Sequence, residues 1–237
     1  MTDRMLTRKG TEWKVVVLAA LLTFHFSLSA TAQTDPEYRL EVGGGVGAVT
    51  YLGDFNGSIV KNLMPMFSAV AKYRFNPRMA VAMNISAGQI KGSYSAANTY
   101  YPEELHDYSF KHSLVDVGLR FEYNFWPFGT GNDYRGAQRL TPYIYIGAGM
   151  TAAKPDKTEM GLNMPIGGGV KYKLADRVNL AAEWTMHFST NDRLDGVKDP
   201  YTIKSSGFFK NTDCYSHLRV SLTYDLWAKC KTCHNDK

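Results

Sequence analysis

The residues that come closest to a known chemical motif lie near the end of the chain. Cys230, Cys233 and His234 match C-x-x-C-H, in which two thiols attach a haem and the histidine binds its iron. The motif follows the last expected strand, with little chain beside it to bury a haem. Three ligands are also one short of a tetrahedral zinc site, and a partner protein would have to supply the fourth. We therefore expect no metal and no cofactor, and interpret Cys230 and Cys233 as a disulfide-forming pair, internally or with a partner protein.

Two further patterns could do chemistry. His106, Asp107 and Ser109 lie together, and a hydrolase or acyltransferase could use a base next to a hydroxyl. These residue types are also ordinary in loops, and we expect no catalysis there. The glycine runs at 43–47 and 167–169 are not phosphate-binding loops, because they lie within alternating segments with no helix following. They indicate close packing of strands.

Composition excludes several classes of protein. The chain has 237 residues, 13% of them aromatic, and a formal charge of +5. So many aromatic residues argue against disorder. Three cysteines are too few for a disulfide framework. The small net charge, without a basic patch, predicts no nucleic-acid partner.

The first 32 residues resemble a secretory signal peptide. A basic segment precedes an apolar run at 15–28, and Ala30-Thr31-Ala32 follows as a small-x-small cleavage site. The run is too short to span a membrane. We expect residues 1–32 to be removed, residues 33–226 to form the folded domain and residues 227–237 to form a tail.

The rest of the chain alternates between polar and apolar residues. Glycine, proline, asparagine and aspartate clusters separate eight such segments, near 38–50, 66–75, 79–92, 109–125, 141–154, 161–174, 178–189 and 213–226. Soluble sandwich strands usually have about 5–6 residues, whereas membrane-crossing strands need about 9–11. An even number of long strands can close without a free edge. The pattern predicts an all-β protein, an eight-stranded antiparallel transmembrane β-barrel.

In such a barrel the apolar face meets lipid and the polar face lines the lumen. Eight strands leave room for side chains rather than a channel. Since neither sign of charge dominates, we expect the lumen to be plugged by ion pairs. The predicted plug residues are Arg39, Glu41, Asp116, Arg120, Glu122, Lys171, Glu183, Arg219 and Asp225.

Connection lengths set the expected orientation. The turns at 76–78 and 175–177 are short, whereas the connections at 51–65, 93–108 and 190–212 are long. The connection at 126–140 is an exception, a long glycine-rich turn on the short side. Outer-membrane barrels have short periplasmic turns and longer outer loops. We therefore expect both ends of the mature chain in the periplasm. Aromatic residues gather beside the short turns, as an interfacial girdle requires: Tyr73, Phe75, Tyr123, Trp126, Tyr172, Tyr224 and Trp227.

Several segments, in order, resemble one known family. They are Tyr51-Leu-Gly-Asp-Phe55, Pro142-Tyr-Ile-Tyr-Ile-Gly-Ala-Gly149, Pro165-Ile-Gly-Gly-Gly-Val-Lys-Tyr172, Asn179-Leu-Ala-Ala-Glu183 and Asn211-Thr-Asp-Cys-Tyr215. The set is similar to the PorG family, outer-membrane barrels of the Bacteroidetes type IX secretion system, over most of residues 38–226. The family often has tryptophan where this chain has Cys214.

The resemblance implies a function in protein transport and no enzymatic activity. The barrel would be an outer-membrane component of the secretion machine that anchors or positions the periplasmic ring of PorK and PorN. Its partners would be this ring and membrane lipid, with no small-molecule substrate. Two alternatives remain open from the residues: a structural or adhesive barrel of the OmpA type, and a lipid-modifying enzyme using His106 and Ser109.

Overall fold

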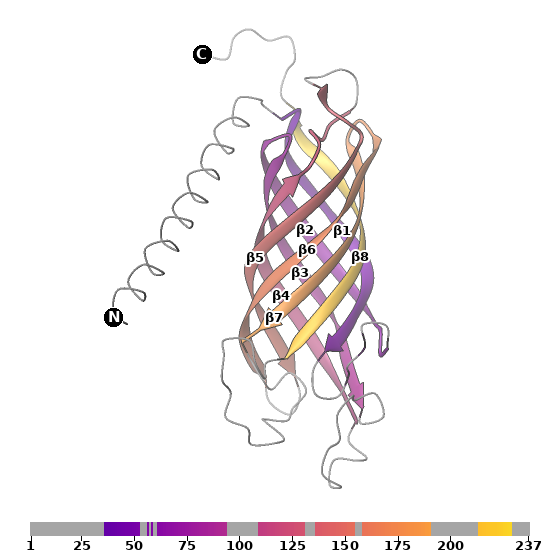
Figure 1. The fold of residues 1–237 in the computed structure, drawn as a ribbon, viewed down its shortest axis with the longest axis vertical. Helices are drawn as coiled ribbons and strands as arrows, with labels where there is room; N and C mark the ends of the chain where they lie inside the picture. The colour runs from indigo at the N-terminus through magenta and orange to yellow at the C-terminus, as the bar shows by residue number, and fades with distance from the viewer. Residues whose placement is uncertain are drawn as a thin grey trace, which may run out of the picture. The chain divides into compact units, whose positions relative to one another are not determined.

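The computed structural model describes residues 36–52, 56, 58, 61–93, 109–130, 136–154, 158–190 and 213–228. The expected signal peptide and the cysteine pair at Cys230 and Cys233 lie outside these residues. Eight strands make up the fold (Figure 1): β1 (Tyr38–Leu52), β2 (Met64–Asn76), β3 (Met79–Ser93), β4 (Ser109–Asn124), β5 (Leu140–Lys154), β6 (Glu159–Ala175), β7 (Val178–Ser189) and β8 (Cys214–Ala228).

The strands form one closed antiparallel barrel in which each strand pairs with its neighbours in sequence. The barrel closes through β1 and β8, whose register runs from Tyr38 opposite Ala228 to Leu52 opposite Cys214. Closure gives every strand two partners, so no edge is left unpaired. The predicted fold class is confirmed, and the bounds of every observed strand lie within two residues of the predicted ones.

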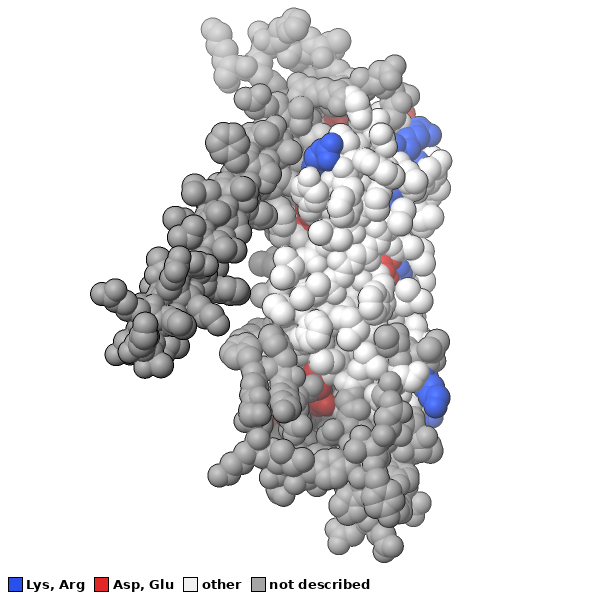
Figure 2. Space-filling model, viewed as in Figure 1, with Lys and Arg blue, Asp and Glu red and all other residues white. Residues whose placement is uncertain are grey.

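Alternation along the strands separates two faces. In β4, Asp116, Arg120 and Glu122 are buried, whereas Val117 and Leu119 are exposed. In the middle of the wall, polar groups thus face inwards and apolar groups outwards, the reverse of a water-soluble sandwich. Figure 2 shows the described part of this wall as mainly uncharged. The apolar side chains include Phe67, Ile85, Val115, Ile144, Met150, Ile166, Trp184, Leu218, Val220 and Leu222.

The length of the apolar face matches a bilayer. On β4 it runs from Val115 to Phe125, every second residue, close to the 9–11 residues that a tilted strand needs to cross. We conclude that the barrel wall is built to face lipid. In the described part of the chain, no helix is long and apolar enough to span a membrane.

Glycines let β1 and β6 approach their neighbours closely. A Cβ added at Gly47 would lie 2.1 Å from the Leu218 carbonyl oxygen. One at Gly167 would lie 2.6 Å from the Tyr145 hydroxyl oxygen, where the Tyr145 side chain now packs. The glycine runs therefore make room inside the barrel, as glycine does where other groups must come near the backbone.

Candidate functional site

The lumen is the candidate site, because it gathers charged groups away from water. Among the described residues, six basic and seven acidic side chains are buried: Lys72, Arg74, Arg120, Lys171, Lys173 and Arg219, with Glu37, Glu41, Asp116, Glu122, Glu183, Asp213 and Asp225. Isolated buried charges are very unfavourable, so each requires a partner of opposite sign or several hydrogen-bond donors.

The first ionic cluster lies towards the short turns. Arg74 pairs with Glu41 and, at 3.0 Å, with Asp225. Lys173 donates to the other oxygen of Asp225 at 2.5 Å. Thr223 donates to the second oxygen of Glu41. Both carboxylates are thereby satisfied on both oxygens, and four strands are joined across the lumen.

The second ionic cluster lies in the middle of the barrel. Glu183 accepts from Arg120 at 2.6 Å and from Arg219 at 2.7 Å. Arg120 also pairs with Glu122 at 2.7 Å, and Glu122 pairs with Lys171 at 2.6 Å. The result is a continuous network of charge-assisted hydrogen bonds, the strong class of such bonds.

Aromatic rings fill the space beside this network. The Lys171 ammonium lies 4.0 Å from the centre of the Tyr143 ring, and the Arg120 guanidinium lies 4.2 Å from that of Tyr145. Both distances are within the range of cation–π attraction. Lys72 lies 3.5 Å from Glu122 and 3.7 Å from Glu41, and thus connects the two ionic clusters electrostatically.

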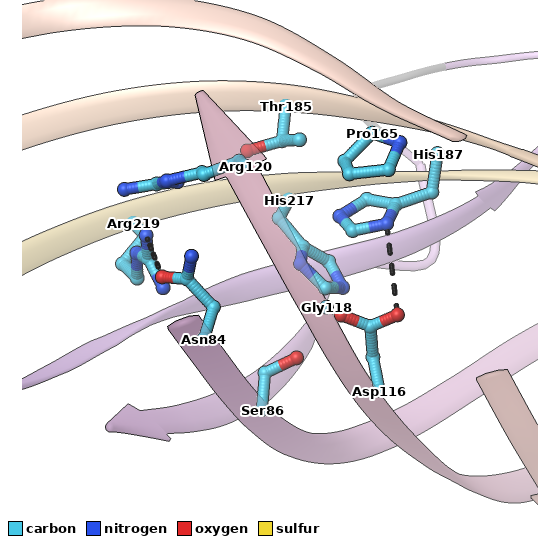
Figure 3. Close-up of a pocket in the computed structure, with 10 residues that line it drawn as sticks. All are labelled: Asn84, Ser86, Asp116, Gly118, Arg120, Pro165, Thr185, His187, His217 and Arg219. Carbon is cyan, nitrogen blue, oxygen red and sulfur yellow. Dashed lines mark hydrogen bonds and ion pairs between the residues drawn. The ribbon is translucent and has the colours of Figure 1, made fainter. Parts of the chain in front are cut away.

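A polar but less charged layer follows towards the long loops. Asp116 accepts hydrogen bonds from Tyr215 at 2.9 Å and from Asn163 at 2.5 Å. The His187 ring stacks on Tyr215, with its Nδ1 atom 3.8 Å from Asp116. Figure 3 shows His187, His217 and Asp116 beside a cavity of about 20 Å³. That volume suits roughly one water molecule and is too small for an organic ligand.

The end of the lumen beside the long loops is mainly apolar. Val49, Tyr51, Met66, Ile90, Phe110, Leu114, Ala153 and Tyr215 form one buried cluster there. The prediction of a polar lumen is therefore wrong for this end. The physical reason is that the strands extend past the lipid, so the barrel end can bury apolar groups as a soluble domain does.

The described part of the connection between β4 and β5 covers the opposite end of the lumen. Phe128 is buried, and its ring centre lies 5.3 Å from the Arg74 guanidinium and 5.6 Å from the Lys173 ammonium. The Thr130 backbone amide donates to Glu37 at 3.0 Å. This connection is thus a cap, which sequence reasoning missed. The signal that the sequence offered was an aromatic residue, Phe128, within a long connection on the short-turn side.

The structure buries eight of the nine predicted plug residues, all except Arg39. Asp116 lies apart from the two ionic clusters, in the histidine layer. Arg39 is exposed, and its placement in the lumen is corrected. The register passes from Leu40 opposite Leu226 to Tyr38 opposite Ala228, and Trp227 between them has a φ of 54°. This irregular end turns Tyr38 inwards, with its ring centre 5.1 Å from Lys173.

The predicted girdle residues lie outside the lumen near the short-turn end. Tyr73, Phe75, Trp126, Tyr172, Tyr224 and Trp227 are exposed, and Tyr123 is half-buried. Tyr73 packs edge-on against Phe75, and Tyr123 against Phe125. Amphipathic rings of this kind suit a membrane–water boundary.

Neither of the two candidate chemical motifs lies wholly within the described residues. The described residues contain no group of three His, Cys, Asp or Glu side chains that could hold a metal ion. Ser109 is exposed at the start of β4, and His106 lies outside the described residues. Since Cys230, Cys233 and His234 also lie outside them, the disulfide interpretation stays a prediction.

Comparisons with known proteins agree with this fold. A family model described as "Domain of unknown function (DUF6089)" matches residues 15–235. In the comparison with curated proteins, none matches the chain. The solved structure of Neisserial surface protein A is 13% identical, with a TM-score of 0.52, covering 79% of this chain and 97% of that one. Ail of Yersinia pestis is 11% identical, with a TM-score of 0.47, covering 80% of this chain and 99% of that one. OprG of Pseudomonas aeruginosa is 12% identical, with a TM-score of 0.46, covering 83% of this chain and 99% of that one.

Proposed function

The chain belongs to the DUF6089 family, and we propose that it is a non-enzymatic outer-membrane component of the type IX secretion machinery. In this role it anchors or positions the periplasmic PorK/PorN ring at the outer membrane. The ordered segments shared with the PorG family support the assignment to this machine. The fold, common to small outer-membrane barrels, supports the location.

The filled lumen is the observation that carries the proposed mode of action. Ion pairs join opposite walls through two clusters, and an apolar cluster and the Phe128 cap lie at the two ends. A barrel filled in this way does not conduct a polypeptide. Its contribution to export is then through its surfaces, which are the two rims and the lipid-facing wall.

The short-turn rim is the surface that a periplasmic ring reaches. It carries Arg78, Arg139 and Arg177, together with the cap around Phe128. The tail at 227–237 leaves from the same end, because β8 ends there. We place the tether in this tail, with Cys230 or Cys233 as the candidate for a covalent link, since disulfides persist in the periplasm.

Deletion of the gene in its host is expected to stop the export of cargo with C-terminal sorting domains. The wild-type chain restores export, and a chain with Cys230→Ser and Cys233→Ser tests the link on non-reducing gels of membrane fractions. A reducible high-mass adduct that only the wild-type chain forms supports the covalent tether. Normal export with altered adhesion contradicts the proposal and favours a structural or adhesive barrel, and altered lipid A favours an enzyme.

A further inference from the structure

We infer that the outer wall of β3, β4 and β5 carries a binding site for the phosphate groups of an outer-leaflet lipid. The site consists of Lys91, Lys111 and Lys154 with Gln89 and Ser113, and is called the outer lysine patch below. The inference rests on the orientation proposed above, with the long connections outside the cell. It is independent of the role in secretion.

The register brings the patch together. Gln89 lies opposite Ser113 and Lys91 opposite Lys111 across β3 and β4. Ser113 in turn lies opposite Lys154 across β4 and β5. All five side chains are on the outward face and exposed. Three ammonium groups and two neutral hydrogen-bond donors therefore share one surface on three adjacent strands.

The lysines have no counter-charge in the described part of the protein. No described carboxylate forms an ion pair with Lys91, Lys111 or Lys154, although ion pairs are abundant inside the lumen. Like charges directly opposite each other in a sheet are destabilising. The pair of Lys91 and Lys111 thus costs stability unless an anion lies between the two ammonium groups.

The position of the patch selects the source of that anion. The next residues down the same strands are Ala87, Val115 and Ala152, and below them lie Ile85, Val117 and Met150. The change from apolar to basic residues happens within one step of two residues, or about 7 Å along a strand. The ammonium groups therefore lie at the level of lipid headgroups, directly above the acyl chains.

The chemistry of the patch fits a phosphate. Lysine binds phosphate as a point charge, and each basic residue near an anionic membrane surface strengthens binding. Gln89 and Ser113 add donors for phosphate or sugar oxygens. A lipid whose phosphates bridge Lys91 and Lys111 removes their repulsion while its chains cover Val115 and Val117. A free phosphate can bridge the two lysines, but it has no acyl chains to cover the valines.

The test is native mass spectrometry of the full chain in detergent micelles titrated with lipid A. The wild-type protein is expected to retain diphosphorylated lipid A at least about tenfold more tightly than the same lipid without phosphates. Combining Lys91→Gln, Lys111→Gln and Lys154→Gln is expected to remove this preference. Arg78→Gln, Arg139→Gln and Arg177→Gln, which remove three charges at the opposite end, are expected to keep it.

Two further outcomes separate this site from its alternatives. Equal retention by the wild-type protein and the triple lysine variant overturns the site, provided that the variant keeps the gel mobility of the folded barrel. If low-millimolar inorganic phosphate displaces lipid A from the protein, the ligand is free phosphate and the proposal of a lipid ligand is wrong. If the protein retains lipid A in a phosphate-dependent way but the deletion strain exports cargo normally, the lipid site stands and only the proposed role in secretion is contradicted.

Discussion

Glu183→Gln is expected to lower the free energy of unfolding of the barrel by about 3–5 kcal/mol. Glu183 is 2% exposed and accepts from both Arg120 and Arg219. The substitution keeps the shape of the side chain and removes its charge, so two guanidinium groups are left buried opposite a neutral amide. Unfolding in urea, followed by tryptophan fluorescence in lipid vesicles, measures the loss.

A control for this variant lies on the neighbouring strand. The hydroxyl of Ser221 is buried, and it has no hydrogen-bond partner in the described part of the barrel. Ser221→Ala therefore removes a lumen polar group without breaking a bond, and is expected to change the free energy of unfolding by less than about 0.5 kcal/mol. Equal effects of the two substitutions would show that the ion pairs do not hold the lumen together.

Leu119→Arg is expected to destabilise the barrel in a bilayer by about 2–4 kcal/mol. Leu119 is 57% exposed and lies in the middle of the apolar run of β4. At that depth a guanidinium group meets hydrocarbon instead of water. The same vesicle unfolding experiment measures the cost.

Ser109→Arg is the matched control, because Ser109 is on the same face of β4 beyond the apolar run and lies opposite Ser93 rather than a lysine. Near the interface the expected cost falls to about 0–1 kcal/mol. If Leu119→Arg were as mild as Ser109→Arg, the exposed leucine would be facing water, and the membrane interpretation of the wall would be wrong.

The alternation of polar and apolar residues was sufficient to predict the barrel and most of the residues that plug its lumen. A strand of period two has only two faces, and burial of Asp116 and Arg120 follows once the apolar face is given to lipid. Pairing of specific partners was not predictable. Arg120 and Glu183 are 63 positions apart, and their contact depends on shear and side-chain conformation across the lumen.

The remaining differences between the predicted and the observed lumen lie at the ends of the strands. Phe110 and Leu114 share the face of Asp116, and Lys111 shares that of Val115, so the polarity reverses within β4. The rule that the inward face is polar and the outward face apolar holds only for the part of a strand inside the membrane. At the other end, the inward turn of Tyr38 and the φ of Trp227 interrupt the alternation and place Arg39 outside.

Quenching of Trp184 by brominated lipid tests most directly whether the apolar wall faces acyl chains. Trp184 is 46% exposed on the outward face of β7, opposite Leu218 and Gly168. In a mature chain with Trp126→Phe and Trp227→Phe, fluorescence is expected to fall strongly in bilayers with bromine on the acyl chains. Unquenched Trp184 in a chain that stays dissolved without lipid or detergent would contradict the account.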